Sequence, residues 1–139
     1  MSKHSNSYHT YLKQVPLFSD LDDDELDAVS SKATDLDLKA GSVIMREGTT
    51  AHEMVVVIEG ELEVTRDGEH IADIGPGGFA GEMALITRSH RNSTVVAKTN
   101  VALLHIDGRD FAGMLQDVPQ VAVKMLPIIV GRFQPPPHH

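Results

Sequence analysis

The chain has 139 residues, no cysteine and a formal net charge of −8 at pH 7 with histidine counted as neutral. This length suffices for one domain with a single core, and the lack of cysteine excludes disulfides, thiolate metal sites and a catalytic thiol. The acidic balance argues against nucleic acid as a direct partner, because binding to a phosphate backbone needs a clustered positive surface.

The N-terminal segment, residues 1–14, is polar and predicted to be partly helical, with a short helix over residues 8–14. It lacks the apolar centre of a signal peptide, and nowhere does the chain contain a run of about 18 apolar residues that could span a membrane. We therefore expect a cytoplasmic protein without a membrane partner.

A second helix is predicted over residues 23–33. Asp22 and Glu25 have the spacing of a capping box, and Leu26, Val29 and Ala33 then recur on one helical face. The acidic run at its start is interpreted as caps and a solvated face rather than as metal ligands, because acids in the first turn favour the helix dipole.

From Asp35 to Ile106 the chain changes to short β-rich runs separated by glycine. Many short strands with regular turn signals favour an antiparallel sandwich or barrel. Asp67-Gly68 is the clearest hairpin turn, since glycine tolerates the positive φ that such a turn needs. Strands are predicted over residues 35–38, 43–46, 54–59, 61–66, 71–74, 94–97 and 102–106.

The stretch from residue 77 to 97 carries the most distinctive chemistry. Gly81 and Glu82 stand at the start of a short helix predicted over residues 83–86, and Arg91 follows nine residues after Glu82. A helix N-terminus, a glycine and an arginine together suit a phosphate ester. An ionised carboxylate only accepts hydrogen bonds, so Glu82 needs a different partner, such as a hydroxyl. The pattern predicts a ligand with both a phosphate and a sugar hydroxyl.

Charge is unevenly distributed around this stretch. Residues 83–106 contain no Asp or Glu, whereas Arg88, Arg91 and Lys98 give this window a charge of +3. One positive stretch in an acidic protein suits a small anion but is too small for a nucleic-acid surface.

Two further helices are predicted after the strands. The first begins at Gly108 or Asp110 and buries Phe111, Met114 and Leu115; the second has Asp117 as a plausible N-cap and Pro119 in its first turn. Pro127 is predicted to kink or end this second helix, because proline in a helix interior removes a hydrogen bond. Residues 134–139 are predicted to be a disordered tail.

The sequence GEMALITRSHRNSTVVAKT, residues 81–99, resembles the phosphate-binding cassette of cyclic nucleotide-binding domains. This module is shared by catabolite-activator regulators, kinase regulatory subunits and nucleotide-gated channels. Three positions differ from the usual family pattern, namely Ala80, His90 and Asn92. The glycine spacing of the strands extends the resemblance over residues 15–133. The residues that align with the cassette are Gly81, Glu82, Met83, Ala84 and Leu85, then His90, Arg91, Asn92, Ser93, Thr94 and Val95.

The resemblance implies a mainly β fold with flanking α-helices, formed as one domain by residues 15–133. Its centre is expected to be an antiparallel β jelly roll, also called a double-stranded β-helix. N-terminal helices, a short phosphate-binding helix and two C-terminal helices are expected to surround it.

The resemblance also implies a binding site. Glu82 would accept a hydrogen bond from the ribose 2′-hydroxyl, and Arg91 would pair with the exocyclic oxygens of the cyclic phosphate, helped by backbone N–H groups. Cyclic AMP is the first choice on family frequency, with cyclic GMP second, because the Asn92 amide both donates and accepts. The implied ligand-binding residues are Gly81, Glu82, Met83, Ala84, Arg91, Asn92 and Ser93.

The expected function is regulation: ligand binding would repack the C-terminal helices and signal to an unidentified effector protein or effector domain. No catalytic motif is found, so we predict neither an enzyme nor a cofactor or metal site. His90 would make binding depend on pH, because histidine titrates near neutrality. Two alternatives stay open: a domain of the same fold that has lost nucleotide binding and serves in interactions, and a cupin-like metal protein, for which His52 beside Glu53 is a weak signal.

Overall fold

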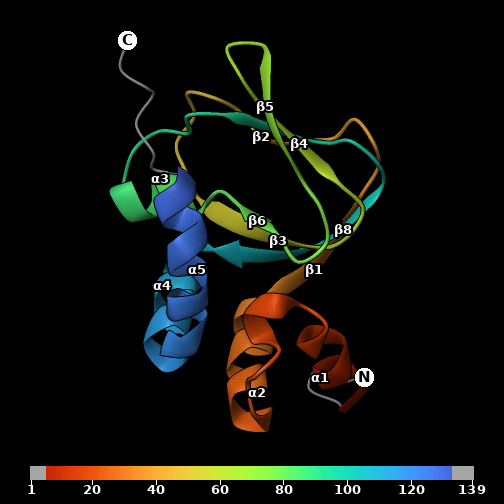
Figure 1. Cartoon of the computed structure of the whole chain (residues 1–139), viewed down its shortest axis with the longest axis vertical. Helices are drawn as coiled ribbons and strands as arrows, with labels where there is room; N and C mark the ends of the chain where they lie inside the picture. Colours follow the sequence, from red (N-terminus) through yellow and green to blue (C-terminus); the bar gives the residue numbers. More distant parts are fainter. Residues whose placement is uncertain (1–5, 133–139) are drawn as a thin grey trace.

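The structure, a computed structural model, describes residues 6–132, and it consists of a β roll with helices packed below it (Figure 1). The predicted tail over residues 134–139 lies outside the described residues. The helices are α1 (Asn6–Lys13), the 3-10 helix η1 (Pro16–Phe18), α2 (Asp23–Lys32), α3 (Glu82–Thr87), α4 (Gly108–Asp117) and α5 (Pro119–Arg132). The strands are β1 (Thr34–Leu38), β2 (Val43–Met45), β3 (Glu53–Glu59), β4 (Leu62–Arg66), β5 (Glu69–Ile74), β6 (Phe79–Ala80), β7 (Thr94–Ala97) and β8 (Val101–Asp107).

The capping box predicted for α2 is present. Asp22 Oδ1 accepts a hydrogen bond from the Glu25 backbone N–H at 2.8 Å, and Glu25 Oε1 accepts one from the Asp22 N–H at 2.9 Å. These two bonds satisfy N–H groups that the helix itself leaves unpaired. Leu26 and Val29 are fully buried on the face that the sequence pattern indicated.

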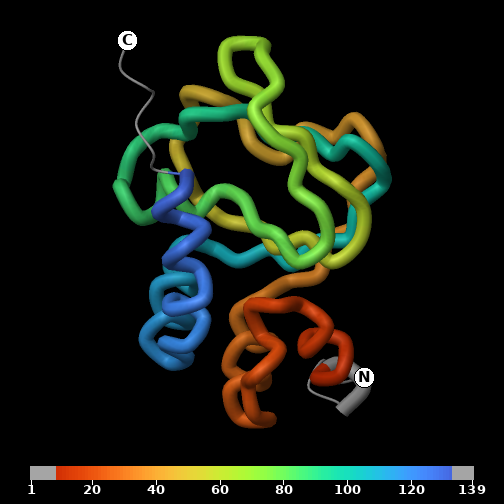
Figure 2. Tube along the Cα trace, in the orientation of Figure 1, coloured from red at the N-terminus to blue at the C-terminus, as the bar shows by residue number. Residues whose placement is uncertain are grey.

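The strands form two four-stranded antiparallel sheets, in the orders β1-β8-β3-β6 and β2-β7-β4-β5, which face each other without closing into a barrel (Figure 2). The jelly-roll prediction is confirmed. Strand β6 was missing from it, because a two-residue strand has too few positions to show an alternating pattern.

Strand β3 is buried on both faces, and it joins two apolar cores. Met54 and Val56 belong to the core shared with the helices, whereas Val55 and Val57 belong to the core between the sheets. Side chains alternate across a strand, so a continuous apolar run is the pattern of a strand covered on both sides.

The β4–β5 hairpin turns at Asp67 and Gly68 as predicted. Both residues have positive φ, 53° and 81° respectively, as a tight hairpin turn requires. The pairing of β4 with β5 shifts register between Val64 and Thr65, so that Thr65 lies opposite His70. Such a bulge changes the direction in which side chains project.

The C-terminal helices correct two predictions. Helix α4 begins at Gly108, one of the two predicted starts, and Asp107 is its N-cap, with Oδ1 accepting from the Arg109 N–H at 2.9 Å. Asp117 ends α4 instead of capping α5. Helix α5 continues through Pro127 to Arg132, so Pro127 does not end it. The carbonyl that would have paired with an N–H at position 127 belongs to Val123, which is exposed, so water can satisfy it.

None of the helices in the range 6–132 is long and apolar enough to cross a membrane.

Candidate functional site

A pocket of about 390 Å³ opens between the second sheet, α3 and the end of α5. Figure 2 shows the last turn of α5 reaching up to the segment that contains α3. All seven residues named from the sequence line this pocket: Gly81, Glu82, Met83, Ala84, Arg91, Asn92 and Ser93. Its volume lies within the range of small-ligand sites, about 300 to 1,000 Å³.

Gly81 shapes the entrance to α3. It is the N-cap residue with φ of 96°, a backbone conformation that favours glycine. A Cβ at this position would lie 2.5 Å from Met45 Cε and 2.8 Å from Arg91 Nη1. Glycine therefore permits both the turn and the close approach of the arginine.

Glu82 is a carboxylate buried at the floor of the pocket. Its residue exposure is 0%, and Oε1 accepts a hydrogen bond of 2.6 Å from Arg132 Nη1. Its second oxygen, Oε2, is buried and has no hydrogen-bond partner among the described residues. Leaving a buried acceptor unsatisfied costs about 1 to 3 kcal/mol, and more for a charged group.

Arg132 reaches this carboxylate from the last residue of α5. Its Nη2 donates to the Phe79 carbonyl at 2.6 Å, and its guanidinium lies over the Phe79 ring, 4.7 Å from the centroid. The side chain therefore makes a salt bridge, a backbone hydrogen bond and a cation–π contact at one place. Helix α5 is joined through it to the floor of the pocket.

Arg91 is buried beside the carboxylate, with a residue exposure of 6%. Nη1 donates to the Gly81 carbonyl at 2.7 Å, Nη2 donates to the Glu53 carbonyl, and the Glu53 carboxylate lies 3.7 Å from Nη2. Burial lowers the pKa of the guanidinium, whereas the charges of Glu53 and Glu82 oppose this shift. A guanidinium has five N–H donors, so these two hydrogen bonds leave three for a ligand.

Asn92 and Ser93 are held by an arginine of the neighbouring strand. Arg66, the last residue of β4, donates from Nε to the Asn92 carbonyl at 3.0 Å and from Nη2 to Ser93 Oγ at 3.2 Å. Ser93 Oγ in turn donates to Asn92 Oδ1 at 3.0 Å.

The rest of the lining is mainly apolar. Strand β4 places Val64 between Val95 of β7 and Ala72 of β5, and all three line the pocket. Met45, Ile71 and Ile74 continue this surface. Such a surface can hold a flat apolar group, while the polar residues at the α3 side offer hydrogen bonds.

The other cations of the acid-free window lie elsewhere. Arg88 and His90 line a separate depression behind α3, and Lys98 pairs with Asp73 at 3.0 Å and with Glu61 at 3.7 Å. Of the three cations in this window, only Arg91 therefore lines the pocket. The predicted effect of His90 on pH dependence would have to act from outside the pocket.

One group in the described part of the chain could hold a metal ion: Glu63, His70 and Asp73 on the β4–β5 hairpin. His70 Nδ1 lies 2.8 Å from Glu63 Oε2 and 3.9 Å from Asp73 Oδ1. Glu63 projects from the face of β4 opposite to Val64, since side chains alternate along a strand. This group is not the inward-facing histidine cluster that the cupin alternative requires.

Sequence reasoning missed three polar residues of the pocket lining, Arg132, Arg66 and Asp73. No signal pointed to Arg132, because the helix was predicted to kink or end at Pro127. The alternation of Leu62, Val64 and Arg66 along β4 could have indicated Arg66, since it places the arginine on the face that carries the apolar residues.

The fold and the pocket define a class of domain: a jelly roll whose short cassette helix and C-terminal helix enclose a ligand-sized cavity. The family model that describes the cyclic nucleotide-binding domain matches residues 36–118. The chain therefore belongs to the cyclic nucleotide-binding domain family, which consists of regulatory ligand-binding domains.

Individual relatives support the same assignment. The chain is 31% identical over 109 residues to a cAMP-dependent protein kinase regulatory subunit from Schizosaccharomyces pombe, covering 78% of this chain and 26% of that protein. It is 36% identical over 108 residues to a cyclic nucleotide-gated potassium channel from Mesorhizobium japonicum, covering 78% of this chain and 30% of the channel. The chain thus spans less than a third of the length of either relative.

A solved structure also shares the fold. The regulatory subunit of a cAMP-independent protein kinase A from Trypanosoma brucei superimposes with a TM-score of 0.74 at 26% identity, covering 86% of this chain and 46% of that one.

Proposed function

We propose that this chain is a regulatory module that binds a cyclic nucleotide, with cAMP as the first candidate, and that binding tightens the packing of its C-terminal helix. The observation that carries the proposal is Glu82 Oε2, a buried carboxylate oxygen that belongs to a residue of the pocket lining and has no partner among the described residues. A ribose hydroxyl would donate to it and remove the cost of the unsatisfied charge.

Arg91 supplies the complementary charge for the phosphate. Arg91 lines the pocket together with Ala84, Asn92 and Ser93, and its hydrogen bonds to the Gly81 and Glu53 carbonyls leave N–H groups that a ligand would use. A hydrogen bond to a charged group contributes about 1.5 to 3 kcal/mol, so a phosphate bound at Arg91 would hold one end of the ligand firmly. The purine would lie against the apolar surface of β4, β5 and β7.

Arg132 provides the physical link between the ligand and α5. It holds Glu82 Oε1, so the same carboxylate would contact the helix with one oxygen and the ligand with the other. A ligand can shift a conformational balance only by its differential affinity for the two arrangements. Here the difference would arise because Glu82 binds the ribose best when Arg132 fixes its orientation.

The relatives support a signalling role, because the similar proteins from S. pombe and M. japonicum are named as a kinase regulatory subunit and a gated channel. This chain would act in the same general manner, on an effector protein or on an effector domain of a longer polypeptide.

Calorimetry with cAMP, cGMP and 5′-AMP tests the proposal. We expect saturable 1:1 binding of at least one cyclic nucleotide, weaker binding of 5′-AMP, and a loss of at least about tenfold in affinity for Arg91→Ala. The control Arg109→Ala removes the same charge from α4. The proposal would be overturned if wild type bound none of the three nucleotides, or if Arg91→Ala bound them with unchanged affinity.

A second function is favoured by one observation. Arg91 already donates to the Gly81 and Glu53 carbonyls, and Arg132 already occupies Glu82 Oε1. These internal contacts could stabilise an interaction domain that binds no nucleotide. In that case no cyclic nucleotide would raise the melting temperature, and Arg91→Ala would lower it.

A further inference from the structure

We infer that Arg66 reads the purine edge and allows this site to accept cGMP as well as cAMP. The inference rests on the proposed function, since it concerns the ligand range of the same pocket. It is carried by the position of Arg66 at the end of the apolar surface and by the way its hydrogen bonds leave donors free.

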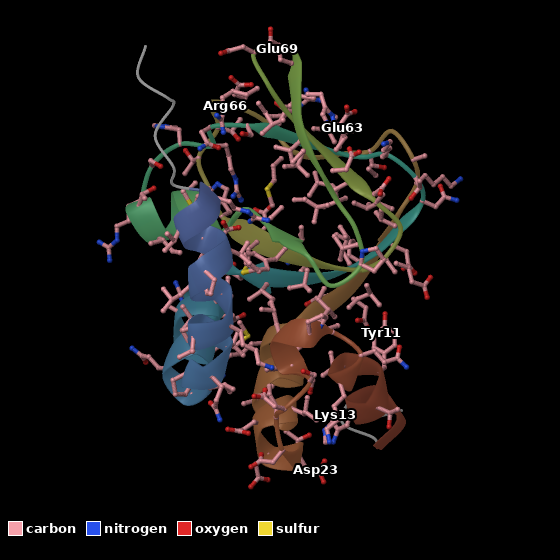
Figure 3. The ribbon with its side chains drawn as sticks, in the orientation of Figure 1. Tyr11, Lys13, Asp23, Glu63, Arg66 and Glu69 are labelled. Carbon is pink, nitrogen blue, oxygen red and sulfur yellow. The ribbon has the colours of Figure 1, made fainter. Side chains whose placement is uncertain are left out.

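The geometry of β4 places Arg66 at the edge of the apolar surface against which a base would lie. Val64 lies at the centre of the apolar surface, and Arg66, two residues later on the same strand, projects from the same face. Arg66 lines the pocket, and its contacts with Asn92 and Ser93 bring it to the residues that follow Arg91. Figure 3 shows Arg66 on the side of the β4–β5 hairpin nearer to α3 and α5. It therefore stands between the phosphate end of the pocket and the apolar surface.

The hydrogen bonds of Arg66 use one edge of its guanidinium. Nε and Nη2 lie on the edge that faces the Asn92 carbonyl and Ser93 Oγ. The adjacent edge, formed by Nη1 and the second hydrogen of Nη2, has no partner among residues 6–132. The cassette thus holds the guanidinium in place, and two adjacent N–H groups remain available for a bidentate hydrogen bond beside the apolar surface.

The same network turns Asn92 into a donor. Arg66 can only donate, so Ser93 Oγ accepts from it and passes its own hydrogen to Asn92 Oδ1. This leaves the Asn92 Nδ2 group, which has no partner in the described part of the chain, as the free half of the amide. Arg66 and Asn92 therefore both present N–H donors next to the apolar surface, and Asp73 of β5 also belongs to the lining there.

A donor edge distinguishes the two purines. Guanine offers two adjacent acceptors, O6 and N7, which match the arginine fork, whereas adenine pairs its N7 acceptor with the N6 amino donor. Facing this edge, cGMP can accept two hydrogen bonds and cAMP only one. The arginine therefore raises affinity for cGMP relative to cAMP, while the phosphate and ribose contacts stay common to both ligands.

The test is the ratio of the cGMP and cAMP dissociation constants, measured by calorimetry on the full chain for wild type and Arg66→Met. Methionine keeps the apolar stem and removes the fork. We expect Arg66→Met to weaken cGMP at least about fivefold more than cAMP, which is the lower end of the discrimination of a bidentate base contact. If the substitution only loosened the cassette, the affinities for both ligands would fall equally, and the ratio of their dissociation constants would stay unchanged.

Two further variants complete the experiment. Arg66→Lys keeps the charge but not the fork, so its ratio should shift in the same direction as that of Arg66→Met. Arg88→Met removes a charge near the cassette but outside the pocket, and its ratio should equal that of wild type. An unchanged ratio in Arg66→Met overturns the role of Arg66 even when both nucleotides bind. Failure of wild type to bind either nucleotide would instead overturn the proposed function.

Discussion

At the scale of single residues, Glu82 is the most constrained side chain of the pocket, because it is charged, fully buried and half satisfied. A further hydrogen bond to a buried carboxylate that has only one partner lowers the free-energy cost of burying its charge. Its two oxygens differ in their surroundings. Oε1 accepts a hydrogen bond from Arg132 of α5, whereas Oε2 has no donor among the described residues. This difference separates a contact with the fold from a contact with the ligand.

The contact with the ligand predicts how Glu82→Ala changes discrimination between nucleotides. In wild type, 2′-deoxy-cAMP should bind about tenfold or more weakly than cAMP, because a hydrogen bond to a charged acceptor is lost. In Glu82→Ala the two ligands should bind with similar affinity. Competition binding measures the ratio of the two affinities in wild type and in Glu82→Ala. Glu82→Gln keeps the shape of the side chain and serves as a second variant in case Glu82→Ala does not fold. Wild type that does not distinguish the two ligands would contradict the assignment of Oε2.

Gly81 predicts a second residue-scale effect. Gly81→Ala introduces a Cβ against Met45, Arg91 and the Glu53 carbonyl, in addition to the strain of positive φ. Gly41→Ala is a matched control, because Gly41 has φ of 90° and nothing within 4 Å of the added carbon, so it should lose only about 1 to 2 kcal/mol.

Urea denaturation and nucleotide titration check this pair. Gly81→Ala should lose more stability than Gly41→Ala and should also bind nucleotide more weakly, since Arg91 must move. Equal effects of the two substitutions on binding would mean that the close approach of Arg91 to Gly81 is unimportant.

The sequence could group the cassette residues into one candidate site because their chemistry is local. Gly81, Glu82 and Arg91 lie within eleven consecutive residues, and each residue type has a specific ability: positive φ, hydrogen-bond acceptance and bidentate donation. Arg132 and Arg66 reach the pocket from 50 residues away on α5 and from a neighbouring strand, so only the tertiary arrangement identifies them.

At the scale of elements, α5 shows how tertiary packing overrides a local signal. Proline in a helix interior costs about 3 kcal/mol when nothing compensates for it. Val121 and Met125 are buried in the core with the other helices, and Arg132 anchors the far end of the helix to Glu82. These contacts on both sides of Pro127 hold the helix together across the missing hydrogen bond.

This arrangement predicts that Pro127→Ala stabilises the protein. Alanine restores an N–H for the Val123 carbonyl and removes the clash of the proline ring, and the greater freedom of the unfolded chain offsets part of the gain. We expect an increase of roughly 1 to 2 kcal/mol in the free energy of unfolding, measured by urea denaturation. Val123→Ala, an exposed substitution on the same helix, should change stability by less than about 0.5 kcal/mol. Destabilisation by Pro127→Ala would show that α5 requires the proline geometry.

Most elements could be predicted because their signals are strong over several residues. The capping box fixed the start of α2, and the Asp67-Gly68 turn fixed the β4–β5 hairpin. The end of α4 at Asp117 and the two-residue strand β6 could not be placed in this way. Their boundaries depend on which N–H or carbonyl finds a partner in the folded chain rather than on a periodic pattern.

At the scale of the whole molecule, the two apolar cores and the pocket form one connected system. Strand β3 carries both cores, the second sheet and α3 form the pocket, and α5 belongs to the helical core while reaching the pocket floor. Among the described residues, α5 makes a polar contact with the cassette through Arg132 and Glu82, and Arg132 also donates to the Phe79 carbonyl of β6. A ligand on Glu82 should therefore be sensed by α5.

The last prediction concerns this coupling and uses amide hydrogen exchange. With saturating cAMP, the amides of residues 128–132 should exchange more slowly than in the free protein, because the ribose hydroxyl fixes the carboxylate that holds Arg132. Saturating 2′-deoxy-cAMP occupies the same pocket without contacting Oε2, so it should protect these amides less. Arg132→Met should remove the difference between the two ligands while leaving the β3 and β8 amides protected.

Linkage makes the prediction reciprocal. If cAMP strengthens the Arg132 contact, then Arg132 must strengthen cAMP binding by the same factor, which for typical couplings is about 5- to 150-fold. Arg132→Met should thus weaken the binding of cAMP but change the binding of 2′-deoxy-cAMP much less. Equal protection of α5 by both ligands, or equal weakening of both by Arg132→Met, would place the coupling elsewhere, for example in the apolar contacts of α5 with the helical core.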